Sequence, residues 1–332
     1  MIWEHHAAEA EFALRAVRAA ASVCRVVRRE MGAISLRKAD SSPVTEADFA
    51  SQALITGWLA ETFPADPLTA EEDSRMLGSD PDLAERVVAR VRQARPEATL
   101  SQLMSWLDCG DGYVSDRFWT LDPIDGTKGL VRGEQYVVAL ALLEAGRVVV
   151  AAVAAPMLGV DLQPRADASG CVVVAVRGQG AWAMPLAGDG GRRLRVSDCS
   201  APSEARVLRS VEDIHTDPAR LARVAKRLGL TRPPLALDSQ AKYLIIAGGE
   251  AELLIRLLPS PKPDYKEKLW DVAAGVLILE EAGGRVTDLH GRPLDLMAGR
   301  ELSHNYGSLI SNGHLHDAAL SAVSRVLAEA AP

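Results

Sequence analysis

Two aspartates around a tight turn are the residues of this chain whose spacing most suits catalytic chemistry. In Trp119–Lys128, Asp122 and Asp125 lie three residues apart across Pro123. Proline cannot take part in a continuous strand ladder, so the apolar residues before Asp122 predict a buried strand that ends here. Gly126 then permits a tight turn. Two carboxylates held on a rigid turn suit Mg²⁺, which prefers carboxylate oxygens, water and substrate phosphate.

The same turn also has a purely structural interpretation, because Asp, Pro and Gly are the usual turn formers. Two other acidic elements favour a functional site. Glu71 follows the apolar Leu68, and Asp271 follows Trp270 in the first turns of an apolar helix predicted over Tyr265–Ala282. Charged side chains in such surroundings are seldom buried without a partner. Together, the three elements predict carboxylates that meet in one pocket.

These elements resemble the magnesium-dependent, lithium-sensitive phosphomonoesterase superfamily of inositol monophosphatases and fructose bisphosphatases. The chain looks most similar to its 3′(2′),5′-bisphosphate nucleotidase branch. The matching stretches are Ser42–Asp48, Glu71–Glu72, Trp119–Gln135, Arg177–Gly180, Asp238–Lys242 and Tyr265–Asp271. The Asp-Pro-Ile-Asp-Gly-Thr and Trp-Asp elements are typical of the superfamily, and the longer runs are typical of the branch.

The resemblance implies a role for each matching residue. The implied metal ligands are Glu71, Asp122, Asp125, Asp271 and the carbonyl of Ile124. The implied catalytic residues are Asp48, Glu71 and Thr127, of which Asp48 and Thr127 would form the pair that orients and deprotonates the attacking water. The implied substrate contacts are His215, Ser239, Lys242 and Arg256. Backbone N–H groups of Gly126 and Thr127 would bind phosphate if a helix begins there.

The electrostatics of this assignment require cations. Asp48 and the four acidic metal ligands would place about five negative charges in one pocket, and two like charges 4 Å apart repel by about 4 kcal/mol at an effective dielectric of 20. Two or three Mg²⁺ ions would neutralise the cluster and lower the pKa of a water. We therefore expect direct in-line attack by an activated water, without a phosphoenzyme.

Two basic residues and one histidine have alternative interpretations. Lys242 and Arg256 both lie in apolar, strand-like runs, where a cation either extends its charge to the surface or meets an anion. Arg256 would extend its charge to the surface if it lies on an edge strand, and it would meet an anion if a second phosphate of the substrate is its partner. His215 lies in a loop, where it is either merely exposed or in contact with a base.

The leading hypothesis is hydrolysis of the 3′-phosphate of 3′-phosphoadenosine 5′-phosphate to give AMP. The resemblance also implies action on the sulfated analogue and inhibition by Li⁺. An inositol monophosphatase or inositol polyphosphate 1-phosphatase is the close alternative, because Leu130 and Ala154–Met157 depart from the branch pattern. A catalytically silent nucleotide- or metal-sensing module is the alternative from another class, although such a relative would be expected to lose Asp48, Glu71 or Thr127.

The elements that must position these residues alternate irregularly between helix and strand. Amphipathic periodicity predicts a helix over residues 7–31, and Thr45–Asp48 has capping-box spacing before a helix over Phe49–Glu61. A hairpin joins Tyr136–Leu143 to Val148–Val153. Further expected elements are a strand over Cys171–Val176, a helix over residues 217–228 and, between residues 73 and 98, a loop with a surface helix. The fold class is mixed α/β, and the resemblance implies a layered αβαβα sandwich of the sugar-phosphatase type.

We expect two closely packed lobes. Residues 1–160 would form an N-terminal α+β lobe with most metal ligands, and residues 161–332 a C-terminal α/β lobe with the substrate contacts and the last ligand. Arginines opposite the apolar stripe of the first helix are either a binding patch or a solvated face.

Composition bounds the partners of the chain. Its 332 residues carry a net charge of −7, which argues against non-specific nucleic-acid binding. The N-terminus holds acidic residues where a signal peptide needs an apolar run, and the most apolar run, Val148–Val160, is too short to span a membrane. Four scattered cysteines fit a reducing cytoplasm. A small phosphorylated metabolite is the expected partner, and the choice between monomer and homodimer stays open.

Overall fold

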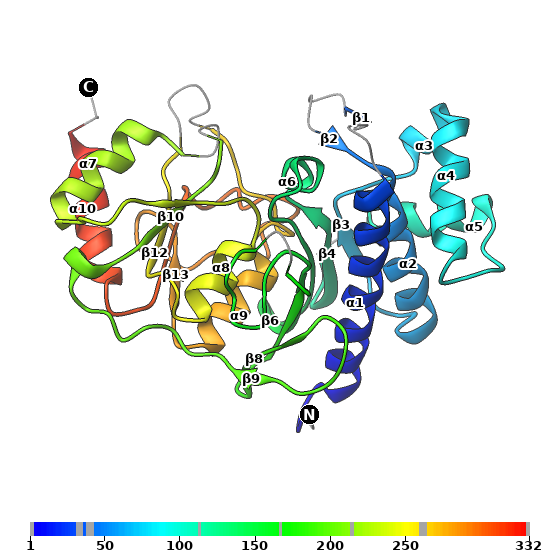
Figure 1. Ribbon diagram of the computed structural model, residues 1–332, viewed down its shortest axis with the longest axis horizontal. Coiled ribbons are helices and arrows are strands. Elements are labelled where there is room, and N and C mark those ends of the chain that lie inside the picture. Colours follow the sequence, from blue (N-terminus) through cyan, green and yellow to red (C-terminus); the bar gives the residue numbers. More distant parts are fainter. Residues whose placement is uncertain are drawn as a thin grey trace.

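The computed structural model describes residues 3–30, 36–37, 43–111, 114–165, 168–212, 216–258 and 264–329. Within this part of the chain, helices and sheets alternate in five layers, and further short helices lie outside the last of them (Figure 1). The layers are a helix pair, a mixed sheet, a second helix pair, a larger sheet and a third helix pair. This order agrees with the predicted αβαβα sandwich.

The larger sheet has seven strands among the described residues. In spatial order they are β3 (Leu68–Ala70), β4 (Arg117–Asp125), β5 (Val137–Glu144), β6 (Arg147–Ala155), β7 (Cys171–Val176), β8 (Gly180–Pro185) and β9 (Arg192–Arg193). Only β3 and β4 pair in parallel, and the later pairs are antiparallel neighbours in sequence. Both faces of the central strands are apolar, since Val138 and Leu140 of β5 face one core and Ala139 and Ala141 face another. A sheet of this kind must be covered on both sides.

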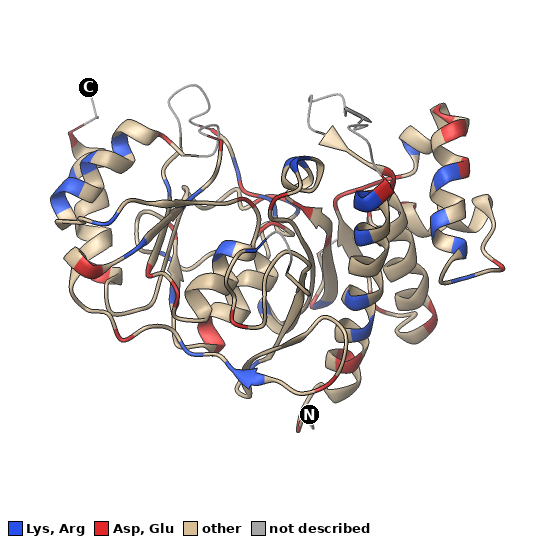
Figure 2. Ribbon diagram, viewed as in Figure 1, with Lys and Arg blue, Asp and Glu red and all other residues tan. Residues whose placement is uncertain are grey.

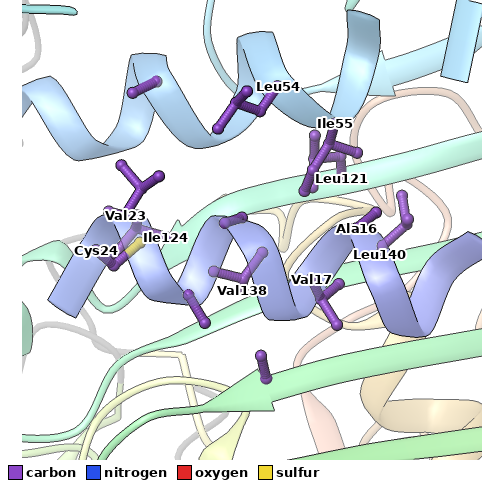
Figure 3. Packing of buried hydrophobic residues seen from close by; sticks show 14 of the residues in the cluster. Ala16, Val17, Val23, Cys24, Leu54, Ile55, Leu121, Ile124, Val138 and Leu140 are labelled. Carbon is purple, nitrogen blue, oxygen red and sulfur yellow. The ribbon is translucent and has the colours of Figure 1, made fainter. Parts of the chain in front are cut away.

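Two long helices, α1 (Ala7–Glu30) and α2 (Glu46–Thr62), cover one face of this sheet. Figure 3 shows Val17 and Cys24 of α1 and Leu54 of α2 directed into the core with Leu121 of β4. These side chains are fully buried. Burial of an aliphatic side chain contributes about 1.5–3 kcal/mol. This core therefore fixes α2 against β4, and both elements carry predicted site residues at their ends.

The opposite face packs against α8 (Ala241–Ala247) and α9 (Ala273–Glu281), which separate the two sheets. The second sheet has the spatial order β11 (Leu235–Ala236), β10 (Val207–Arg209), β12 (Leu253–Arg256), β14 (Ser308–Ser311) and β13 (Arg285–Thr287). Its outer face is covered by α7 (Pro218–Leu228) and α10 (His316–Ala328).

The remaining described elements lie around this frame. They are β1 (Leu36–Arg37), β2 (Pro43–Val44), α3 (Arg75–Ser79), α4 (Pro81–Arg92), α5 (Leu100–Asp108), α6 (Thr127–Arg132) and the 3₁₀ turn Pro202–Glu204. No described helix combines the length and the hydropathy that a membrane crossing requires.

Arg15 and Arg29 of α1 are exposed, as a solvated face predicts, but two other arginines of this helix make contacts that neither sequence interpretation anticipated. Figure 2 shows their charges along the helix. Arg18 donates to the carbonyls of Pro185 and Gly188, and Arg25 donates to the carbonyl of Ser169. These arginines therefore satisfy backbone carbonyls of loops beside the sheet, which ties α1 to the strand ends.

The seven-stranded sheet continues past residue 160, because β7, β8 and β9 extend it to Arg193. A boundary at residue 160 would therefore cut the sheet between β6 and β7. The division of the chain into two lobes at that residue stays a prediction.

Candidate active site

The predicted aspartate turn lies where β4 leaves the sheet. The ladder between β4 and β5 is regular as far as Asp122, shifts register across Pro123 and resumes at Asp125. The Asp122 carboxylate accepts a hydrogen bond from the backbone N–H of Ile124 at 3.1 Å. Gly126 has φ of 94°, a conformation that glycine adopts without strain, and α6 begins at the next residue. The irregularity thus turns both carboxylates away from the ladder.

The N-terminus of α2 contacts this turn. Thr45 caps the helix in the predicted capping box. The backbone N–H and the hydroxyl of Thr45 both donate to Asp48 Oδ2, each at 2.7 Å. The hydroxyl of Thr127 donates to Asp48 Oδ1 at 3.0 Å, and the Ile124 carbonyl lies 3.2 Å from the same hydroxyl. Asp48 is therefore buried and is hydrogen-bonded to Thr127.

A cavity of about 210 Å³ gathers most of the predicted residues. Its lining contains Glu71, Asp122, Ile124, Asp125, Gly126, Thr127, Ser239, Lys242, Arg256 and Asp271. Asp48 does not line the cavity but is hydrogen-bonded to Thr127, which does. His215 lies outside the described residues. The acidic residues predicted from distant stretches thus meet in one place.

Ser239 and Gln240 connect this cavity to the layer between the sheets. Ser239 has φ of 68°, a left-handed conformation uncommon for a residue with a side chain. This turn directs the backbone N–H of Gln240 onto Asp125 Oδ2 at 2.6 Å. The predicted contact residue Ser239 therefore also shapes the path of the chain beside a candidate metal ligand.

The helix predicted over Tyr265–Ala282 begins later than expected, at Ala273. Asp271 instead lies in a turn, where its N–H donates to the carbonyl of Lys268 at 3.2 Å. The residues before it bond elsewhere, since Leu269 N–H donates to the Arg300 carbonyl and Lys268 forms an isolated bridge with Glu301. Contacts distant in sequence thus override the local helical pattern, and they direct Asp271 into the cavity.

Lys242 lies on α8, and not in a strand as its apolar neighbours suggested. Its side chain is fully buried, and its ammonium group donates to the Leu237 carbonyl at 3.0 Å. Burial and the nearby Arg256 lower the pKa of Lys242 to about 8, although Asp125 opposes this change. A second anion near Lys242 would stabilise its charged form.

Arg256 lies on β12, which pairs on both sides and is not an edge strand. It neither reaches solvent nor lacks an anionic partner, because its guanidinium forms an ion pair with Glu267 at 2.6 Å. Its buried Nε has no hydrogen-bond partner in the described part of the structure. Arg256 nevertheless lines the cavity, so its guanidinium contributes positive charge there.

The carboxylates of the cavity disfavour one another's charge. Burial and then the neighbouring Asp125 and Glu71 raise the pKa of Asp271 well above its usual range. Burial also raises the pKa of Asp125, while Lys242 and Arg256 oppose that shift. Cations relieve such crowding, because they favour the ionised form of each carboxylate.

The donor set fits Mg²⁺ better than a metal that needs a full protein cage. Among the described residues, no three acidic, histidine or cysteine side chains are grouped so that they could hold an ion by themselves. Mg²⁺ commonly keeps several waters and binds through one or two carboxylates together with substrate phosphates. Six acidic residues line the cavity, and the four predicted ligands among them, with Ile124 in the same lining, match that behaviour.

Sequence reasoning missed several lining residues. They are Pro43, Lys128, Ser210, Glu212, Asp238 and Tyr265, to which Glu267 is added as the partner of Arg256. Lys128 forms an ion pair with Glu212. The resemblance could have indicated four of these residues, because they lie in the stretches that match the family: Lys128, Asp238, Tyr265 and Glu267. Ser210 and Glu212 had no signal, because only the fold brings their loop to the cavity.

Comparisons with known proteins agree with this architecture. The sequence model of the inositol monophosphatase family matches residues 8–328. A 3′(2′),5′-bisphosphate nucleotidase of Schizosaccharomyces pombe is 36% identical over 339 residues, covering 96% of each chain. One of Emericella nidulans is 38% identical over 341 residues, covering 94% of this chain and 96% of the relative.

Solved structures share the fold at lower identity. The Thermotoga maritima IMPase superposes with a TM-score of 0.67 at 22% identity, covering 97% of this chain and 98% of that one. An inositol monophosphatase from Zymomonas mobilis gives a TM-score of 0.65 at 22% identity, covering 97% and 100%. These likenesses support the layered fold.

Proposed function

The chain belongs to the inositol monophosphatase family, and from this premise we propose that it removes the 3′-phosphate of 3′-phosphoadenosine 5′-phosphate, giving AMP and phosphate. It is a phosphoric monoester hydrolase of the bisphosphate nucleotidase type, like its relatives at 34–38% identity. The observation that carries the proposal is the cavity that joins the four proposed acidic ligands to the buried cations Lys242 and Arg256.

The acidic residues would hold the metal. Glu71, Asp122, Asp125, Asp271 and the Ile124 carbonyl are the proposed ligands of two or three Mg²⁺ ions. When bound, Mg²⁺ neutralises the cluster, supplies an acidified water and stabilises charge on the phosphoryl oxygens. The Ile124 carbonyl lies within reach of the Thr127 hydroxyl, so any ligand role for that oxygen depends on where this hydroxyl points.

Thr127 and Asp48 would move the proton of the attacking water. The Thr127 hydroxyl donates to Asp48 Oδ1, which leaves its oxygen lone pairs to accept a hydrogen bond from a water in the cavity. Asp48 keeps this orientation because Thr45 holds its other oxygen. Glu71 borders the same cavity and would orient the same water. No covalent intermediate with the protein is needed.

The substrate would be held from both sheets. The backbone N–H groups of Gly126 and Thr127 would bind the departing phosphate at the start of α6. Lys242 and the guanidinium of Arg256 would bind the phosphate that remains, with Ser239 beside them. We further propose that His215 contacts the nucleoside. A ligand with two phosphates would thus satisfy the buried cations as well as the metals.

A phosphate-release assay tests the function. Purified protein should hydrolyse 3′-phosphoadenosine 5′-phosphate with Mg²⁺, lose activity with a chelator and be inhibited by Li⁺. The variant Asp122→Asn should lower kcat/KM at least about 100-fold through weaker metal binding, whereas Asp198→Asn, at a fully exposed site, should not change it. A clear preference for inositol monophosphate would replace the nucleotide proposal, and full turnover by Asp122→Asn would refute the metal assignment.

The location proposed for this enzyme is a reducing cytoplasm. All four cysteines are free thiols, and Cys24 and Cys171 are buried. Burial raises the pKa of both thiols to about 12, which makes them poor nucleophiles.

A further inference from the structure

Gln240 joins two of the segments that carry candidate metal ligands. Its backbone N–H donates to Asp125 Oδ2 at 2.6 Å. Its side-chain Nε2 donates to the Trp270 carbonyl at 3.0 Å, and its Oε1 accepts from the Gly275 N–H at 3.0 Å. The side chain is 0% exposed. One residue therefore contacts the end of β4 and both sides of the turn that contains Asp271.

The two side-chain bonds fix that turn at both of its ends. The Trp270 carbonyl immediately precedes Asp271 in the chain. Gly275 lies in the first turn of α9, where backbone N–H groups lack partners within the helix. Val272, at the N-cap of this helix, makes no side-chain cap. Oε1 of Gln240 supplies the missing acceptor, so the start of α9 and Asp271 are held by the same amide.

Close packing of α8 on α9 brings the amide within reach. Gly275 has no Cβ, and a Cβ built there would come within 2.5 Å of the Tyr243 ring on α8. The absence of a side chain allows the two helices to approach. On the other side, the left-handed turn at Ser239 directs the N–H of Gln240 to Asp125. Both geometries are needed for the three bonds to form together.

We propose that Gln240 is a positioning residue, which sets the separation of the Asp125 and Asp271 carboxylates and thereby the affinity of the cavity for divalent cations. The inference rests on the proposed function, because it takes these carboxylates as ligands. The amide serves both bonds, since its NH₂ group donates to the Trp270 carbonyl while its oxygen accepts from the Gly275 N–H. The side-chain amide also interacts with the Asp125 carboxylate, whose charged form it favours, so Gln240 acts on one candidate ligand directly and on Asp271 through the turn that it holds.

Cation affinity, measured without turnover, tests this role. Mn²⁺ is titrated into the full chain and into Gln240→Met, and electron paramagnetic resonance measures the free ion. Gln240→Met keeps the length of the side chain but removes the hydrogen bonds of its amide group. Residues that orient metal ligands typically change affinity about 10- to 100-fold when substituted. We expect the Kd for Mn²⁺ to rise by that factor in Gln240→Met, with kcat at saturating Mg²⁺ falling less than the affinity.

Asn312→Leu is the matched control. Asn312 is also a buried amide, which donates to the carbonyls of Ser197 and Cys199 and accepts from the Leu315 N–H ahead of α10. It does not line the cavity. Its loss should cost comparable stability, seen as a lower Tm, while leaving the Mn²⁺ Kd and the basal activity unchanged.

A second variant keeps the proposal testable if Gln240→Met does not fold. Gln240→Glu retains an acceptor for Gly275 but loses the donor to Trp270, and we expect it to bind Mn²⁺ less tightly than the unsubstituted chain. A Kd within about twofold of the unsubstituted value in either folded variant overturns the proposal, as does an equal rise in Asn312→Leu. Failure of the unsubstituted chain to bind Mn²⁺ or release phosphate would instead overturn the proposed function.

Discussion

The hydroxyl of Thr127 has a single proton and two acceptors within reach. Asp48 Oδ1 lies at 3.0 Å and the Ile124 carbonyl at 3.2 Å. An ionised carboxylate is the stronger acceptor, so the proton belongs on the side of Asp48. The hydroxyl oxygen is then free to accept a hydrogen bond from water, and it would take up the water's proton as its own proton moves to Asp48. The chemistry assigned to the pair depends on this one orientation.

Thr127→Val removes that hydroxyl while keeping the shape of the side chain. We expect kcat to fall about 10²- to 10⁴-fold, the usual contribution of a positioned acid or base, with little change in KM because the backbone N–H remains. Thr127→Ser keeps the hydroxyl and should retain most of the activity. Steady-state kinetics at saturating Mg²⁺ separates the two effects. Equal kcat values for the Val and Ser variants would remove Thr127 from the mechanism.

The residues that sequence reasoning placed poorly are those whose partners lie far away in the chain. Arg256 was expected either to reach solvent from an edge strand or to meet a phosphate; it lies on an inner strand and pairs with Glu267, and its phosphate contact stays a prediction. Lys242 was expected in a strand because its neighbours are apolar, but α8 is buried on all sides and therefore has no polar face. By contrast, Asp122 and Asp125 were placed correctly, since proline and glycine dictate the turn locally.

At the scale of elements, the N-terminus of α2 has two functions. The same carboxylate of Asp48 completes the capping box with Thr45 and accepts the hydrogen bond of Thr127. Helix capping and the candidate proton pathway are therefore coupled. Thr45 does not line the cavity, but a substitution there should alter the hydrogen bond between Asp48 and Thr127.

Thr45→Ala should lower the free energy of unfolding by about 1 kcal/mol, the usual cost of losing an N-cap side chain. It should also lower kcat, because Asp48 loses the hydroxyl that holds its Oδ2. Thr99→Ala breaks the other capping box, at the start of α5, and should cost similar stability with unchanged kcat. Urea unfolding and steady-state kinetics give the two quantities. A Thr45 variant that is destabilised but fully active would separate the cap from the chemistry.

Elements with local signals were predicted well from the sequence. The strand Cys171–Val176 has the predicted bounds, and the first helix ends within one residue of the expected position. The helix expected from Tyr265 failed because long-range backbone bonds hold residues 268–271 in a turn. The short strands β10 and β11 gave no readable signal, since two or three residues show no periodicity.

At the scale of the molecule, the cavity is built from both sheets and the helices between them. Asp122 and Asp125 come from the larger sheet, Lys242 from the intervening helix α8, and Arg256 from the second sheet. The order of the layers was predictable from the family resemblance. That residues of these layers line one cavity could be predicted only from the expectation that the carboxylates lie together. Cations bound there would link parts of the chain more than a hundred residues apart.

Mg²⁺ should therefore stabilise the whole fold and not only a loop. A ligand that binds the native state alone adds about 2.7 kcal/mol at a hundredfold excess over its Kd. For a chain of this size, such a gain corresponds to a rise in Tm of a few degrees, in a single transition. Calorimetry with Mg²⁺ and with a chelator measures the shift, and Asp122→Asn should abolish most of it. If the chelator leaves Tm unchanged, or if only a minor early transition moves, the cations do not join the two sheets in the way that the cavity indicates.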